Sequence, residues 1–442
     1  MAHAPKEVTS QTSTEYEASD ASSQNRSGPP SAAKMSTLTT GRFWFFSFGV
    51  YAGLFLSAID ASIVASSLHS IALDFQAFRL VNWVALAYTL AETGCVVVFA
   101  RLADIIGRRT AFLLAMGLFL TFSIACGFSQ TMGQLVAFRA LQGVGAAGIY
   151  GISIIMLSEA CPEHLFELST ALSGLVVVGA FILGPILGGA ITGWTTWRWI
   201  FWMNGPICAA SMITFLLSWP KGADIPSLTR HSFKSFDYIG SILLIAFSVL
   251  FVFAFQHVGS TIPSSWAGAV FIVPITISVA CLVGLLTWGY LVHHRLAKDV
   301  LPTFPLSLFR NRFYAAAVLT TLLLGFPLLF LIYSVPLNAQ IGTGKSAISA
   351  SLLLLPLLGT TAAGGLAGAL VNAKKNYIFE CTFVGACLMT LGCALLTTTS
   401  SVGGDSKFLG YLTLAGFGSG ITTSATTILV ANEISPRNYG MN

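Results

Sequence analysis

Long apolar runs, separated by short polar stretches, dominate the chain from residue 43 onward. Each run is near or above the roughly 20 residues that an α-helix needs to cross the hydrocarbon core of a bilayer. The pattern predicts twelve spans, centred in residues 43–68, 82–100, 110–128, 135–158, 169–192, 199–218, 237–257, 266–291, 313–336, 347–371, 378–398 and 408–431. We therefore predict an all-α polytopic membrane protein.

Composition excludes several classes of protein. Hydrophobic residues make up 55% of the chain and charged residues 9%, and the mean hydropathy is +0.79, which no soluble fold requires. The formal charge of +5 comes from basic residues in short loops between apolar runs, so nucleic-acid binding is not expected. We find no metal-ligand spacing, phosphate loop or pair of nucleophile and base, and we expect no metal, no cofactor and no enzymatic activity.

The distribution of basic residues predicts the orientation. With the amino terminus in the cytoplasm, thirteen basic residues fall in cytoplasmic loops and four in outer loops, as the positive-inside rule requires. Residues 1–40 are rich in Ser, Thr, Ala, Glu and Pro and lack a cleavable signal, which predicts a disordered cytoplasmic tail. We expect an integral multi-pass protein of the plasma membrane, with a vacuolar or vesicle membrane as the alternative.

A charged loop between the second and third spans stands out in so apolar a chain. Residues 100–109 read ARLADIIGRR, and this stretch resembles the G-x-x-x-D-R-x-G-R-R/K signature of the major facilitator superfamily. Four residues match the signature: Asp104, Gly107, Arg108 and Arg109. Ala100 replaces the first Gly, and Ile105 replaces the usual Arg. We predict a gating loop in which Asp104 gains and loses a partner between conformations, whereas Arg108 and Arg109 could equally serve only to fix topology.

The fourth span carries a second motif. Residues 139–147 read RALQGVGAA and resemble the R-x-x-Q-G-x-G-A-A pattern of the same superfamily through Arg139, Gln142, Gly143 and Gly145. An arginine within an apolar span is costly unless it meets a partner or a polar cavity, so Arg139 is a candidate for proton coupling. The alternative is that its side chain extends to the outer membrane surface.

The fifth span contains a glycine- and proline-rich stretch that resembles the motif of the antiporter branch of the superfamily. The residues concerned are Gly179, Gly184, Pro185, Gly188 and Gly189. A proline removes a backbone donor and small residues allow a neighbouring helix to approach closely, so we predict a helix-packing role. Packing without any part in transport is the alternative.

Two carboxylates lie within predicted spans of the amino-terminal half. Residues 58–65 read AIDASIVA and resemble the L-D-x-T-I-V-N-V-A-L-P signature of the fourteen-spanner drug:proton antiporters, with Asp60 as its acidic residue. Glu92 lies near the middle of the second span. Because burial favours the neutral form of a carboxyl group, either residue could carry a coupling proton. A structural carboxylate permanently paired with Arg139 is the alternative.

A tryptophan-rich run, residues 192–206, precedes and enters the sixth span. It resembles the W-R-W-I-F-x-I-N-x-P run of the fourteen-spanner branch. Tryptophan is enriched at membrane–water interfaces, so we interpret the run as an aromatic interface belt.

The superfamily resemblance implies two six-helix halves. The stretch most similar to the gating loop is the glycine-rich segment 364–375. The gating loop follows the second span of the first half and this segment follows the tenth span, so the second half would begin at the ninth span. We therefore predict a tail (1–40), an amino-terminal six-helix half (41–220), loops with two linker helices (221–311) and a four-helix part of the second half (312–442), with two family helices missing. A twelve-spanner of six plus six helices is the alternative.

These resemblances imply an antiporter that uses protons to expel small amphipathic or hydrophobic compounds by alternating access, like fungal toxin and drug efflux pumps. Its expected partners are a small-molecule substrate, protons and the lipid bilayer, and it is expected to act as a monomer. Two other functions stay open, namely a proton-coupled importer of a siderophore or nutrient, and a truncated membrane protein that does not transport.

Overall fold

A computed structural model gives the conformation of most of the chain. It describes residues 39–78, 80–162, 165–219, 236–259, 266–292, 294, 306–345, 347–374, 377–399 and 406–434. The predicted amino-terminal tail lies outside these residues, apart from its last two positions. All twelve predicted spans lie within them.

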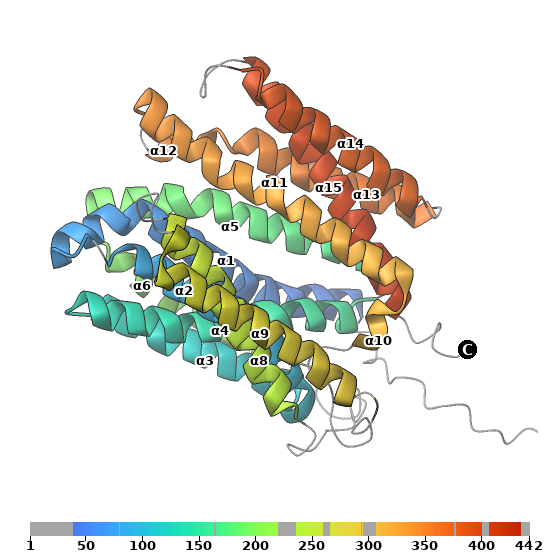
Figure 1. Cartoon of the computed structure of the whole chain (residues 1–442), viewed down its shortest axis with the longest axis horizontal. Coiled ribbons are helices and arrows are strands. Elements are labelled where there is room, and N and C mark those ends of the chain that lie inside the picture. Colours follow the sequence, from blue (N-terminus) through green and yellow to red (C-terminus); the bar gives the residue numbers. More distant parts are fainter. Residues whose placement is uncertain are drawn as a thin grey trace, which may run out of the picture.

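Helices form nearly all of the described chain (Figure 1). They are α1 (Thr40–Phe75), α2 (Asn82–Ile106), α3 (Arg108–Gly127), α4 (Met132–Ala160), α5 (Phe166–Trp194), α6 (Trp199–Trp202), α7 (Asn204–Ser218), α8 (Tyr238–Gly259), α9 (Ala269–Leu291), α10 (Leu306–Phe309), α11 (Arg312–Thr343), α12 (Ala347–Leu352), α13 (Leu355–Lys374), α14 (Ile378–Leu396) and α15 (Ser406–Ile434). Eleven segments in this part of the chain are long and apolar enough to cross a membrane. The prediction of an all-helical polytopic membrane protein is confirmed.

Polar residues and glycine set the helix ends. The Thr131 side chain accepts a hydrogen bond from the backbone N–H of Gln134 at the start of α4, which satisfies one of the donors left free at a helix N-terminus. Between α2 and α3, Gly107 adopts φ = 92°, a conformation that glycine reaches without a steric penalty. The charged loop is therefore a sharp turn between two helices.

Two predicted spans are interrupted in the structure, and a third is helical but less apolar than the others. The segment 199–218 is interrupted at Met203, between α6 and α7, and the segment 347–371 is interrupted between α12 and α13. The twelfth predicted span, 408–431, is helical within α15, although α15 is not among the eleven apolar segments. Its sequence is rich in Gly, Ser and Thr, which lowers its hydropathy without preventing a helix.

Helices α1–α7 form one bundle. In this bundle α1 packs against α5 and α7, and α4 packs against α2 and α3. Gly143 and Gly145 of the fourth-span motif allow the close contact of α4, because a Cβ at either position would overlap backbone atoms of Tyr88 or Phe119. The motif glycines are therefore packing positions.

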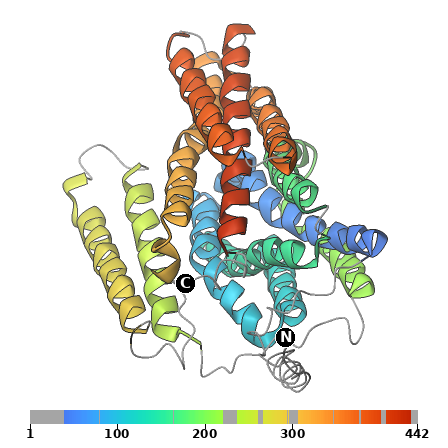
Figure 2. The ribbon, with the colours of Figure 1, turned by 90° about the vertical axis from the view of Figure 1, so that its right-hand side faces the viewer.

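Helices α11–α15 group together beside this bundle, and α5 contacts both α12 and α13 (Figure 1). Helix α15 packs against α13 and α14, again through glycines: a Cβ on Gly364 would overlap the carbonyl of Phe417. Gly364 and Gly368 thus lie inside α13 in contact with α15, and not in a loop. Helices α8 and α9 pack on each other, and α8 contacts α2 (Figure 2).

Candidate functional site

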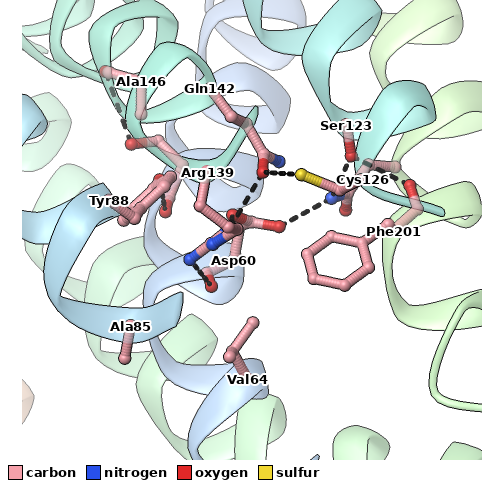
Figure 3. A network of polar contacts seen from close by, with 12 residues as sticks. Asp60, Val64, Ala85, Tyr88, Ser123, Cys126, Arg139, Gln142, Ala146 and Phe201 are labelled. Carbon is pink, nitrogen blue, oxygen red and sulfur yellow. Dashed lines mark hydrogen bonds and ion pairs between the residues drawn. The ribbon is translucent and has the colours of Figure 1, made fainter. Parts of the chain in front are cut away.

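Asp60 of α1 and Arg139 of α4 form an ion pair inside the first bundle (Figure 3). Both side chains have no exposed surface. The Arg139 Nη1 donates to Asp60 Oδ2, and its Nε donates to the backbone carbonyl of Val84 at 3.1 Å. Arg139 therefore does not extend to the membrane surface, and two sequence candidates from distant spans meet.

Other side chains make this buried pair tolerable. Gln142, one helical turn from Arg139, accepts from the Arg139 Nη1 at 2.9 Å. The guanidinium lies 4.1 Å from the centre of the Tyr88 ring and 5.6 Å from that of Phe201. Burying a charge is costly unless it is paired and hydrogen-bonded, and here both conditions are met. Gln142 is therefore a direct partner of the candidate site.

Asn204, the first residue of α7, is a member of the site that the sequence interpretation did not single out. Its Nδ2 donates to Asp60 Oδ1 at 2.8 Å and to Ser123 Oγ at 3.0 Å. The tryptophan-rich run that contains Asn204 was interpreted as an interface belt, so this contact was missed. A polar amide inside an apolar span was the available signal.

Glu92 of α2 has a different environment from Asp60. Its Oε1 accepts a hydrogen bond from Ser57 Oγ at 3.2 Å, and within the described part of the chain no ion pair is formed by Glu92. The structure thus brings Arg139 to Asp60 and not to Glu92. Asp60 has a cationic partner, whereas the described residues give Glu92 none.

The predicted gating loop carries a cluster of ion pairs. Arg108 Nη1 lies 2.6 Å from Asp104 Oδ1, and Arg101 lies 3.6 Å from Asp104 Oδ2. Arg108 also donates through two nitrogens to Glu159 at the end of α4, at 3.0 and 3.3 Å. Arg109 is exposed, and the described residues give it no ion pair. The sequence interpretation did not single out Glu159. Its position at the end of an apolar span was the available signal.

The motif of the fifth span faces α1. A Cβ on Gly184 would overlap Ser62 Oγ, and one on Gly188 would overlap Ser66 Oγ, whereas Gly179 has open space around it. The Ser62 hydroxyl donates to the carbonyl of Ala180 at 3.2 Å. Pro185 and Gly189 lie in the same helix and are half-buried. Two of the five motif residues therefore make the tight α1–α5 contact.

A further ion pair lies beyond the apolar segment of α1. The Asp74 carboxylate accepts from Arg198 Nη1 at 2.8 Å and from the indole N–H of Trp197 at 3.0 Å. These two hydrogen bonds hold the pKa of Asp74 below its ordinary value, the bond from Arg198 having the larger effect. The pair ties the end of α1 to the segment between α5 and α6.

A cavity of about 120 Å³ lies between α5 of the first bundle and helices α13 and α15. Its lining contains hydroxyl-bearing residues but no charged or aromatic side chain. The hydroxyl-bearing residues are Thr170, Thr361, Thr423, Ser424 and Thr427. The lining suits an uncharged molecule with a few hydrogen-bonding groups.

All eight cysteines are free thiols. Across the residues whose placement is described, no group of three or more His, Cys, Asp or Glu side chains is arranged to hold a metal ion.

Comparison with known proteins identifies the family. The model of the Major Facilitator Superfamily matches residues 50–304, which is more than half of the chain. The chain is 31% identical over 398 residues to the MFS-type transporter FPY5 of Fusarium mangiferae, covering 88% of this chain and 66% of that protein. It is 33% identical to the efflux pump dotC of Dothistroma septosporum, covering 87% of this chain and 64% of that protein. The chain thus spans about two thirds of the length of these curated relatives.

A bacterial relative and solved structures agree with these matches. Multidrug resistance protein 3 of Bacillus subtilis is 27% identical, over 90% of this chain and 74% of that protein. A double-tryptophan mutant of XylE has the same fold, with a TM-score of 0.58 at 12% identity, over 88% of this chain and 82% of that chain. A partially occluded, inward-open structure of the xylose transporter XylE from E. coli gives a TM-score of 0.52 at 11% identity, over 88% of this chain and 87% of that chain. The chain belongs to the Major Facilitator Superfamily, a family of membrane transporters and not of enzymes.

Proposed function

We propose that this protein is a proton-coupled exporter of small amphipathic or hydrophobic compounds that works by alternating access. The observation that carries the proposal is the buried Asp60–Arg139 pair, with Glu92 in the same bundle, a carboxylate to which the described residues give no ion pair. Carboxylates within spans are expensive to bury and are typical of proton pathways. Similarity to proteins named efflux pumps supports the direction of transport.

Proton uptake would act on the contact between α1 and α4. A proton that neutralises Asp60 removes its attraction to Arg139, so the contact between the two helices weakens. Release of the proton on the cytoplasmic side restores the pair and resets the carrier. Glu92 is the second candidate for this proton, because it lies half-buried within a span and the described residues give it no cationic partner.

The gating loop would bias which side is closed. Asp104 and Glu159 both contact Arg108, so the turn between α2 and α3 is tied to the end of α4. The Arg108–Glu159 pair must break when α4 moves relative to α2 and α3, whereas the Arg108–Asp104 pair lies within the turn. The cluster therefore stabilises one state over the other.

The substrate would bind in the cavity between α5 and helices α13 and α15. Because its lining has hydroxyl groups but no charge, it favours molecules that are largely apolar and uncharged. The buried ion pair is not part of this lining, so the substrate and the proton would occupy separate sites.

The organisation that we propose follows the sequence. Residues 41–220 form the amino-terminal half, 221–311 the linker with its two helices, and 312–442 a part of the second half, with the amino terminus in the cytoplasm. The carrier acts as a monomer in the plasma membrane, with protons and the small-molecule substrate as its partners.

Dye efflux tests the function. Cells that express the chain are loaded with the amphipathic dye Nile red and then energised, and the loss of fluorescence is followed with and without a protonophore. We expect efflux that the protonophore abolishes, and that Asp60→Asn or Glu92→Gln abolishes if that residue carries the proton. Efflux that survives the protonophore and both substitutions contradicts proton coupling, and dye accumulation on energisation indicates import.

A matched pair of substitutions on α5 tests the cavity. Gly174 lines the cavity, whereas Gly179 does not, and a Cβ at either position has open space around it. Gly174→Leu is expected to reduce Nile red efflux, because its side chain fills the cavity, and Gly179→Leu to retain it. Equal efflux by both variants would place the substrate elsewhere.

A further inference from the structure

Asn204 lies at an interruption in a membrane-spanning segment. Helix α6 ends at Trp202 and α7 begins at Asn204. Pro206 has no N–H to pair with the carbonyl of Trp202, which weakens the helix at this point. Ser123 of α3 donates to the carbonyl of Phe201 at 2.9 Å (Figure 3). The Asn204 side chain is 2% exposed, so its amide must find its partners inside the bundle.

The amide of Asn204 holds the second oxygen of the buried carboxylate. Asp60 Oδ2 accepts from Arg139, and Asp60 Oδ1 accepts from Asn204 Nδ2 at 2.8 Å. The same Nδ2 also lies 3.0 Å from Ser123 Oγ, which accepts from it. Side chains of α4 and α7 therefore hold one carboxylate of α1, and the Asn204 amide links that carboxylate to Ser123 of α3.

The two partners of Asp60 differ in what they can do when the carboxyl group is neutral. A neutral carboxyl group carries an O–H that needs an acceptor, and a buried donor without an acceptor is destabilising. Arginine has donors only, whereas the asparagine amide has a donor nitrogen and an acceptor oxygen. Of these two partners, only Asn204 can serve both states, by turning its amide.

We propose that Asn204 is a positioning residue that hydrogen-bonds Asp60 in both protonation states. Because Asn204 is the first residue of α7, protonation of Asp60 would then alter the side-chain contacts at the break between α6 and α7. The proposal rests on the proposed proton coupling at Asp60. Hydronium from the solvent transfers a proton to Asp60 Oδ1, and a water molecule is left. The Asn204 amide then turns, its oxygen accepts the new O–H, and its nitrogen no longer donates to Asp60 or Ser123.

Several other groups act on Asp60 from the helices around it. Besides Arg139 of α4, they are Tyr88 and Glu92 of α2 and Cys126 of α3. A substitution of Asn204 leaves all four side chains in place. A change in the titration of Asp60 in such a variant therefore reports on the amide.

Infrared titration of the purified chain in lipid tests the proposal without transport. The carboxyl band of Asp60 is the pH-dependent band that Asp60→Asn removes. In Asn204→Leu the ionised carboxylate loses a hydrogen bond to a charged group, which is stronger than the neutral hydrogen bond that the protonated form loses, so we expect the midpoint of this band to move up by about one pH unit. Asn204→Ser, whose hydroxyl both donates and accepts, is expected to bring the midpoint part of the way back.

A control and the efflux assay separate the possible failures. Asn338→Leu, a change of the same size at an exposed amide of α11, is expected to leave the midpoint unchanged. An Asp60 midpoint that Asn204→Leu does not move, or no Asp60 band at any pH at which the protein stays folded, overturns the role of Asn204. A midpoint that moves as expected, in a chain that does not pump Nile red, retains the positioning role and overturns the proposed function instead.

Discussion

The guanidinium of Arg108 lies 3.0 Å from the carboxylate of Glu159 and 2.6 Å from that of Asp104. One arginine thus joins the turn between α2 and α3 to the end of α4. The neighbouring Arg109 is exposed. Two adjacent arginines of one motif therefore have different environments.

This difference predicts unequal effects of the two arginines. Glu159→Gln or Arg108→Gln removes the partly buried, bidentate ion pair between these two side chains. We expect a loss of about 1–2 kcal/mol of unfolding free energy together with slower Nile red efflux. Arg109→Gln is expected to change neither. Thermal unfolding in detergent and the efflux assay measure both quantities. Equal losses for Arg108 and Arg109 would mean that the motif acts through its total charge.

The Asp60–Arg139 pair predicts a non-additive pair of substitutions. Asp60→Asn leaves the Arg139 charge buried without its partner, and Arg139→Gln does the same to Asp60, so each is expected to cost about 3–5 kcal/mol. The double variant removes both charges, so its loss of unfolding free energy is expected to be smaller than the sum of the two single losses. A double-mutant cycle of thermal unfolding measures this coupling, and strict additivity would show that the two charges do not stabilise one another.

The contact between α1 and α5 predicts a difference between two glycines of one motif. Gly184→Ala adds a methyl group where Ser62 already lies, and we expect a destabilisation of about 1–3 kcal/mol with reduced efflux. Gly179→Ala, in open space on the same helix, is expected to be neutral. Adding Ser62→Gly to Gly184→Ala should recover stability. If the second substitution does not help, the clash is not the cause.

The Asp74–Arg198 pair predicts a dependence of stability on pH. The pKa of Asp74 is lowered in the folded state by the hydrogen bonds from Arg198 and Trp197. Its contribution to stability is therefore complete above the unfolded pKa of about 3.9 and is lost as the pH falls through the folded pKa. Asp74→Asn is expected to lower the Tm at neutral pH by a small amount, since a partly exposed pair contributes about 1 kcal/mol or less. The difference from the unmodified chain should shrink in acid, and a gap that stays constant would contradict this account.

The amino-acid pattern alone predicts the helices and most candidate side chains. Apolar runs of bilayer length must become helices, because a backbone in lipid has to satisfy its own hydrogen bonds. Charged residues in such runs stand out for the same reason, so Asp60, Glu92 and Arg139 are recognisable from the sequence alone. Breaks inside a span, such as the one at Met203, were missed because the apolar pattern continues through them.

Only the tertiary structure decides which of these side chains meet. The spacing of Arg139 and Gln142 on one helix fixes their common face, but the choice of Asp60 over Glu92 depends on how α1, α2 and α4 pack. The same is true of Asn204 and Glu159, whose partners lie on other helices. Local periodicity is set within one helix. Contacts between distant spans instead depend on close packing at residues such as Gly143 and Gly184, and no single stretch of sequence contains both partners of such a contact.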